Sequence, residues 1–225
     1  MAPEQRLIFA LDVPTAERAF SLVEALSGHV GCFKIGLELF IACGPELVRQ
    51  IAGRAPVFLD LKLHDIPATV GRAAAMAEAL KVSYLTVHPG QDAVKAAVQA
   101  APNVEILMVT VLTSISAEEI ADAGAGSLSE LVVARARRAA SWGCRGVICS
   151  GHEVEAVRQA VDQDLLLVTP GVRPTGSARG DQARVVTPAE AIARGADKIV
   201  VGRPIRDAAD PVSAAAAIVD ELKRG

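Results

Sequence analysis

Short apolar runs recur along the whole chain, and Ala-rich amphipathic segments separate them. Such runs are typical of buried strands, whereas the segments between them carry apolar residues at helical spacing. The expected strands are Leu7–Leu11, Cys32–Ile35, Val57–Leu61, Tyr84–Val87, Glu105–Val109, Gly146–Cys149, Leu165–Val168 and Lys198–Val201. The expected helices are Ala16–Leu26, Glu46–Ala52, Ala68–Leu80, Gln91–Ala100, Leu128–Ser141, Glu153–Ala160, Pro188–Arg194 and Pro211–Lys223.

This strict alternation predicts an α/β fold, a (β/α)8 TIM barrel that forms a single domain over residues 1–225. An open doubly wound sheet is the alternative, but it favours a glycine-rich loop after the first strand, and Asp12–Thr15 contains no glycine. A Gly/Ser/Arg-rich loop, Arg173–Gln182, follows the seventh strand, where barrels commonly place a mobile loop beside a phosphate site.

Composition and charge exclude several classes of function. Hydrophobic residues make up 51% of the chain, which is enough for a large core. A net charge of −3, with only five Phe, one Trp and one Tyr, argues against nucleic-acid binding. No apolar stretch reaches the roughly 18 residues of a membrane span, and the start of the chain lacks the pattern of a signal peptide. We therefore expect a cytoplasmic protein.

Cysteine and histidine spacing argues against a metal site. The cysteines form no CxxC pair, and we expect them to be reduced and mostly buried; they are Cys32, Cys43, Cys144 and Cys149. The histidines are widely separated along the chain; they are His29, His64, His88 and His152. Neither set has the spacing of zinc ligands, so no bound metal is expected.

Polar residues stand where the expected strands end, which is where barrel enzymes place their active sites. In chain order they are Asp12, Lys34, Asp60 with Lys62, His88, Thr113 with Ser114, Arg173, and Gly202 with Arg203. Asp60 and Lys62 are two positions apart on a strand, so both side chains should face the barrel mouth. A buried ion pair is the alternative, but burying charge costs several kcal/mol per ion, which favours a functional array.

Two further positions concern the same end of the barrel. Asp65 could belong to the group of charged residues at the strand ends. It could equally be the N-cap of the next helix, with Pro67 in the first turn of that helix, and the sequence leaves both possibilities open. Gly202 and Arg203 turn from the last strand into a helix, where backbone N–H groups and the guanidinium would bind a phosphate. We assign no proton transfer to His64 or His88.

Residues Phe58–Val70 (FLDLKLHDIPATV) resemble the signature of the orotidine 5′-phosphate decarboxylase family. Further matching segments follow in the family's order across nearly the whole chain: Ala10–Asp12, Phe33–Gly36, Thr169–Pro174, Asp181–Val185 and Val201–Ile205. The similarity is greatest to the bacterial branch of the family.

The resemblance implies an enzyme that converts orotidine 5′-phosphate to uridine 5′-phosphate and CO2, the last step of de novo UMP synthesis. Lys62 would donate a proton to C6 of the pyrimidine, in a network with Asp60, Lys34 and an Asp65 from the partner subunit. The resemblance also implies a homodimer with shared active sites, a lid formed by the loop before Gln182, and no metal or organic cofactor.

Substrate contacts are implied in the same way. The ribose would be held by Asp12, Lys34, Asp65 and Thr69, the pyrimidine by Thr113, and the phosphate by Arg173, Gln182, Gly202 and Arg203, with Ile66 also lining the substrate. Loss of CO2 leaves a C6 carbanion that the ring cannot delocalise, so a fixed positive charge such as Lys62 is required.

Two other functions are alternatives for this sequence. Related metal-dependent sugar-phosphate decarboxylases and aldolases share the Asp-x-Lys-x-x-Asp pattern, but they carry a metal-binding Glu where this chain has Lys34. An ammonium at that position would repel Mg²⁺. A barrel that only binds a nucleotide as a sensor would not need the Asp60 and Lys62 pair.

Overall fold

Eight parallel strands close into a barrel in sequence order, and the last strand pairs with the first. The computed structural model describes residues 1–112, 117–122, 124–175 and 185–224. The strands are β1 (Leu7–Ala10), β2 (Cys32–Gly36), β3 (Val57–Leu63), β4 (Tyr84–Val87), β5 (Glu105–Val109), β6 (Gly146–Ile148), β7 (Leu166–Thr169) and β8 (Lys198–Val201). The predicted (β/α)8 fold is confirmed.

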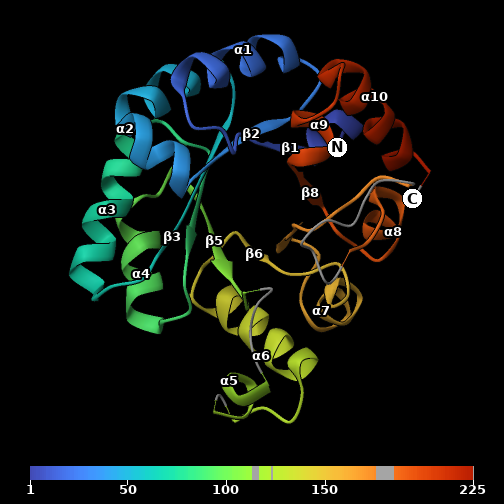
Figure 1. Ribbon diagram of the computed structural model, residues 1–225. Helices are drawn as coiled ribbons and strands as arrows, with labels where there is room; N and C mark the ends of the chain where they lie inside the picture. Colours follow the sequence, from blue (N-terminus) through green and yellow to red (C-terminus); the bar gives the residue numbers. More distant parts are fainter. Residues whose placement is uncertain (113–116, 123, 176–184, 225) are drawn as a thin grey trace.

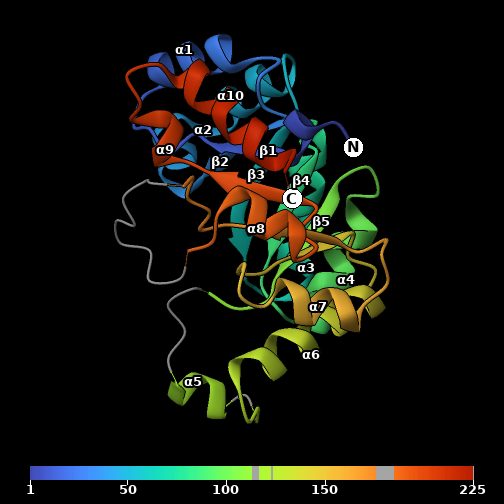
Figure 2. The same cartoon turned by 90° about the vertical axis from the view of Figure 1, so that its right-hand side faces the viewer.

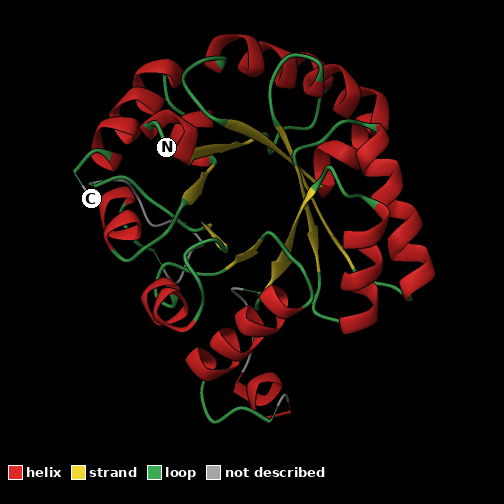
Figure 3. Cartoon of the chain, turned by 180° about the vertical axis from the view of Figure 1, so that it is seen from behind, coloured by secondary structure: helices red, strands yellow, loops and turns green. Residues whose placement is uncertain are grey.

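Helices surround the ring of strands (Figures 1 and 3). They are a short 3-10 helix η1 (Pro3–Arg6), α1 (Ala16–Leu26), α2 (Leu37–Ala52), α3 (Pro67–Ala79), α4 (Gln91–Ala100), α5 (Ala117–Asp122), α6 (Leu128–Ser141), α7 (Val154–Ala160), α8 (Pro188–Ala193), α9 (Arg203–Arg206) and α10 (Pro211–Leu222). Seen from the side, the N-terminus and α9 lie toward opposite ends of the barrel (Figure 2).

All eight expected strands are present, and the main differences concern helices. The helix expected from Glu46 is only the second half of α2, which begins at Leu37. Gly44, with φ 70° and ψ −172°, interrupts the helical backbone between the two halves. The Gly44-Pro45 pair therefore marks a kink inside α2 rather than its start. The helices η1 and α5 were not predicted; α5 lies outside α6, away from the barrel (Figure 1).

The strands carry apolar side chains on both faces, since one face packs against the surrounding helices and the other packs inside the barrel. The larger core cluster lies between strands and helices and includes Phe9 and Phe33. A smaller cluster contains residues of alternate strand positions inside the barrel, among them Ile8, Ala10 and Phe58. Burial on both sides explains why the strands appear in the sequence as short continuous apolar runs.

The four cysteines are free thiols, as expected. Cys32, Cys144 and Cys149 are buried, and burial raises the pKa of each thiol to about 12. These three side chains therefore act as small apolar groups of the core. Within the described part of the chain, no helix is both long and apolar enough to cross a membrane.

Candidate active site

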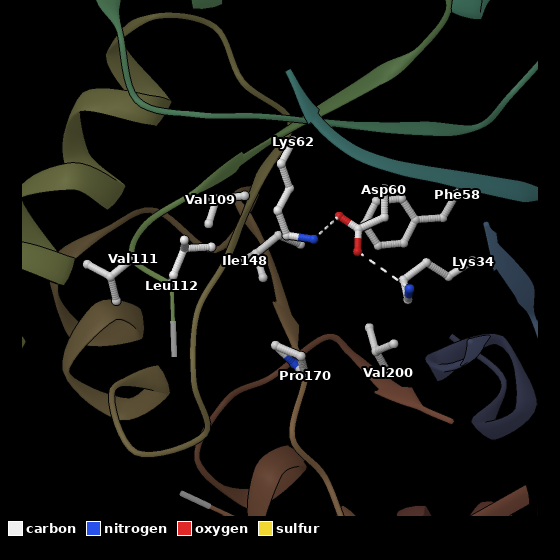
Figure 4. A pocket seen from close by; sticks show the side chains of 10 residues that line it. All are labelled: Lys34, Phe58, Asp60, Lys62, Val109, Val111, Leu112, Ile148, Pro170 and Val200. Atoms are coloured by element: carbon white, nitrogen blue, oxygen red, sulfur yellow. Dashed lines mark hydrogen bonds and ion pairs between the residues drawn. The ribbon is translucent and has the colours of Figure 1, made fainter. Parts of the chain in front are cut away.

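A pocket opens at the C-terminal end of the barrel, and its walls divide into an apolar half and a polar half. The apolar half is lined by Phe58, Val109, Val111, Leu112, Ile148, Pro170 and Val200, beside Lys34, Asp60 and Lys62 (Figure 4). The polar half shares Lys34, Asp60, Pro170 and Val200 and adds Ala10, Asp12, Gly171, Arg173, Gly202 and Arg203. The two halves form one continuous site with charged side chains at their boundary.

Four charged side chains, from β2, β3 and the segment after β1, form a row of alternating sign. Lys62 Nζ lies 2.9 Å from Asp60 Oδ1, and Lys34 Nζ lies 3.5 Å from Asp60 Oδ2. Lys34 Nζ also lies 3.3 Å from Asp12 Oδ1, which follows β1. Lys62 ends the row on the side of the apolar half (Figure 4). The sequence-based expectation that these residues meet at the barrel mouth agrees with this arrangement.

The row opens into the pocket and is not sealed in the core. The side chain of Asp60 is 13% exposed and that of Lys62 is 33% exposed. Both line the pocket, so a ligand there would contact the charges directly. This exposure argues against the alternative of an ion pair that only fills the barrel interior.

Asp60 is held in its ionised form. Burial would raise its pKa, but the ammonium groups of Lys34 and Lys62 outweigh that effect, and hydrogen bonds from Lys62 and Thr86 add to them. The pKa of Asp60 consequently lies below its ordinary value. A carboxylate that keeps its negative charge can hold the Lys62 ammonium in one place.

Lys62 itself has an unusual backbone conformation. Its φ of 50° lies in the left-handed region, which costs a residue with a side chain about 1–2 kcal/mol. The strand is irregular here, because its pairing with β4 shifts between Leu59 and Leu63. Asp60 and Lys62 thus both lie in an irregular stretch of β3. Such strain is common at functional sites.

The polar half is suited to an anion. Gly202 precedes the first residue of α9, and a Cβ there would lie 3.3 Å from Ala10 Cβ and 3.6 Å from an Asp12 carboxylate oxygen. Glycine thus keeps space open beside Arg203 and the buried Arg173, both of which line the pocket. Arg206 Nη1 donates to the Asp12 carbonyl oxygen at 2.9 Å and ties α9 to the end of β1.

The residues that follow β3 do not join this site within their own chain. Asp65 Oδ1 accepts a hydrogen bond from the neighbouring Ile66 N–H at 2.6 Å, and Asp65 is exposed. The N-cap of α3 is Ile66 and has no side-chain cap, so the capping alternative for Asp65 is wrong. Asp65, Ile66 and Thr69 are not among the residues that line the pocket of this chain. Thr113 and Gln182 lie outside the described residues.

His64 and His88 pack against each other beside the site, with ring centroids 5.2 Å apart. Burial lowers the pKa of His88, and the charges of His64, Lys62 and Arg135 lower it further. Neither ring is among the residues that line the pocket. Among the described residues, no three His, Cys, Asp or Glu side chains gather as a metal site.

The apolar half was not predicted from the sequence, although a signal for it exists. Phe58 precedes Asp60 by two positions, and Val200 precedes Gly202 by two, so strand alternation directs each toward the same interior as its polar partner. Val109 and Ile148 stand at the ends of β5 and β6. Reading apolar as well as polar residues at strand ends would have found most of this wall.

Comparisons with known proteins identify the family of the chain. The model of the orotidine 5′-phosphate decarboxylase / HUMPS family matches residues 5–218. A relative from Anaeromyxobacter sp. (strain K) is 55% identical over 228 residues, which cover 99% of this chain and 100% of the relative. A relative from Thermobifida fusca (strain YX) is 47% identical over 220 residues, or 96% of this chain and 94% of the relative. Both are named orotidine 5′-phosphate decarboxylase.

Solved structures of orotidine 5′-phosphate decarboxylases share the fold of this chain. The orotidine 5′-phosphate decarboxylase from Lactobacillus acidophilus superposes with a TM-score of 0.84 at 34% identity, over 96% of this chain and 98% of that one. The enzyme of the same name from Pyrococcus horikoshii OT3 superposes with a TM-score of 0.81 at 27% identity, over 96% and 99%. The resemblance seen in the motifs is therefore confirmed, and the chain belongs to the orotidine 5′-phosphate decarboxylase / HUMPS family.

Proposed function

We propose that the protein decarboxylates orotidine 5′-phosphate to uridine 5′-phosphate without a metal or organic cofactor, with Lys62 as the proton donor. The observation that carries this proposal is the position of Lys62 Nζ, which is held 2.9 Å from Asp60 beside the apolar half of the pocket. A planar pyrimidine fits that half, and a C6 atom placed beside Lys62 would meet a fixed positive charge.

The two halves of the pocket support one orientation of the substrate. The phosphate is placed against Gly202, Arg203 and Arg173, where backbone N–H groups and guanidinium groups complement a dianion. The pyrimidine then extends into the apolar half, and the ribose crosses the boundary beside Asp12 and Lys34. Thr113 and Gln182 are proposed as further pyrimidine and phosphate contacts, on the family resemblance alone.

The reaction needs little beyond a fixed charge and a proton. The bond between C6 and the carboxylate breaks, CO2 leaves, and the electron pair remains on C6. The Lys62 ammonium stabilises this pair and transfers one proton to C6, which leaves a neutral amine that regains its proton from solvent. Asp60, ionised and bonded to Lys62, orients the ammonium so that little rearrangement is needed during the reaction.

A homodimer would complete the site. Asp65 is exposed and does not reach the pocket of its own chain, which supports its contribution, with Thr69, to the site of a partner subunit. Large apolar side chains are exposed on α2 and α3 and at the start of α3: Ile41 at 79%, Met76 at 64% and Ile66 at 65%. Exposed apolar groups of this kind are typical of an interface between subunits. A nucleotide substrate also supports the expected cytoplasmic location.

A metal-dependent sugar-phosphate lyase is the second candidate, since the family model includes that branch by name. The position of Lys34 argues against it. Its ammonium lies within 3.5 Å of the carboxylates of both Asp12 and Asp60, which are the oxygens that a divalent cation would need. The negative charges of Asp12 and Asp60 are thus already balanced by the ammonium groups of Lys34 and Lys62, in place of a metal ion.

The proposal is tested with protein purified from a host that lacks its own orotidine 5′-phosphate decarboxylase. Loss of the ultraviolet absorbance of orotidine 5′-phosphate is followed with and without EDTA, and uridine 5′-phosphate is identified as the product. We expect turnover that EDTA leaves unchanged. Turnover that EDTA abolishes and Mg²⁺ restores would support the metal-dependent alternative, and absence of turnover would refute the proposal.

A further inference from the structure

The irregular pairing of β3 with β4 places one residue of β4 opposite residues 60–62 of β3, which include Asp60 and Lys62. Leu59 pairs with Leu85 and Leu63 pairs with Val87, so residues 60–62 lie opposite Thr86 alone. The backbone N–H of Lys62 consequently has no regular strand partner on β4. It donates to the side chain of Thr86 instead, over 2.9 Å.

The Thr86 hydroxyl also reaches Asp60. Thr86 Oγ1 donates to Asp60 Oδ1 at 2.9 Å. Asp60 Oδ1 also accepts a hydrogen bond from Lys62 Nζ at 2.9 Å. The direction of each bond is fixed, because the Lys62 amide can only donate and the ionised carboxylate can only accept. The hydroxyl therefore closes a ring that runs from the Lys62 backbone through Asp60 to the Lys62 ammonium.

We propose that Thr86 is a positioning residue, whose hydroxyl fixes the Lys62 backbone and the Asp60 carboxylate so that the Lys62 ammonium points at the reacting carbon. This inference rests on the proposed function. Thr86 is fully buried and is not among the residues that line the pocket, so it acts through Asp60 and Lys62 and not on the substrate.

Removing the hydroxyl would affect both partners at once. The Lys62 N–H would lose its acceptor in the half-buried part of the strand, where an unpaired donor is unfavourable. Asp60 would keep its ion pairs with Lys34 and Lys62 but would lose the hydrogen bond from Thr86, so the carboxylate and the Lys62 ammonium paired with it would be free to shift together. The ammonium would then sample positions away from the reacting carbon, and a displacement of about 1 Å is enough to cost roughly 100-fold in rate.

The test compares two substitutions of Thr86 with a matched control. Thr86→Val keeps the size and the β-branched shape and removes the hydroxyl, whereas Thr86→Ser keeps the hydroxyl. Thr169→Val makes the same change at a fully buried strand residue whose hydroxyl has no hydrogen-bond partner in the described part of the chain. Thermal unfolding shows that each variant is folded. Thr86→Ala replaces the valine variant if that one does not fold.

For Thr86→Val we expect kcat to fall by about 10- to 100-fold while KM and the Kd for uridine 5′-phosphate change by less than about threefold. Thr86→Ser should restore kcat to within about threefold of the wild type, and Thr169→Val should match the wild type. Wild-type turnover, measured first, tests the proposed function by itself. Given that turnover, an unchanged kcat in Thr86→Val, or an equal loss in the valine and serine variants, would overturn the role of Thr86.

Discussion

The ammonium of Lys34 on β2 lies 3.5 Å from the Asp60 carboxylate on β3, and it does so from the side opposite Lys62. Each carboxylate oxygen of Asp60 therefore has its own cation. With both oxygens engaged, the carboxylate cannot turn without breaking an ion pair, and Lys62 is held by a group that is itself fixed. Preorganisation of this kind is what electrostatic catalysis requires.

Lys62→Ala tests the central role of the ammonium. We expect turnover of orotidine 5′-phosphate to fall by at least about 1,000-fold, because both the fixed charge and the proton donor are lost. Binding of uridine 5′-phosphate, measured by calorimetry, should persist, since the phosphate and ribose contacts come from other residues. Lys95→Ala on the exposed face of α4 is the control and should behave as the wild type. Substantial residual turnover in Lys62→Ala would contradict the mechanism.

Arg203→Ala tests the phosphate site. We expect kcat/KM to fall by the equivalent of about 2–5 kcal/mol, the range for losing one partner of a buried charge pair. Arg203→Lys keeps the positive charge but not the bidentate geometry of the guanidinium, so its kcat/KM should fall less than that of Arg203→Ala. With the nucleoside orotidine, which has no phosphate, the effect of Arg203→Ala should nearly vanish. An equal loss on both substrates would show that Arg203 is structural.

Mixing two inactive variants tests whether the active site is shared between subunits. Lys62→Ala and Asp65→Ala homodimers should each be nearly inactive. In a mixed dimer one site carries both substitutions and the other carries neither. Random exchange gives about half mixed dimers with one intact site of two, so roughly a quarter of wild-type activity should return. No recovery, under conditions shown to exchange subunits, would mean that Asp65 does not act across an interface.

His88 should make stability depend on pH. Burial and the nearby charges of His64, Lys62 and Arg135 hold its pKa below the ordinary value of 6.5. Between the two pKa values the unfolded chain binds more protons than the folded one, so the free energy of unfolding rises with pH there. The contribution of His88 to stability is therefore fully present above pH 6.5 and is lost as the pH falls below 6.5. Urea unfolding from pH 7.5 to about 5.5 should show this slope.

His88→Asn is the matched variant for that measurement, since it removes the titrating ring and keeps a polar side chain. Its free energy of unfolding should change less over the same pH interval than that of the wild type. Equal slopes in the two proteins would show that His88 does not account for the pH dependence.

The alternation of strands and helices and the charged residues at the strand ends could be predicted from the sequence. Both depend on local patterns: apolar runs of strand length, amphipathic segments, and polar groups at the points where runs end. For this reason β4, β5 and β8 have the predicted bounds. Asp60 and Lys62 were expected to meet because they are neighbours on one strand.

Contacts between distant segments required the tertiary structure. The bond from Thr86 to Asp60 joins positions 26 residues apart, and it depends on a shift in strand register that no local pattern encodes. The Asp65 side chain fits a helix cap by sequence, yet the structure turns it to the backbone of Ile66, because α3 begins one residue later than a cap at Asp65 requires. Local pattern determines which elements form, whereas the register between strands determines which side chains meet, because register depends on how the whole barrel closes.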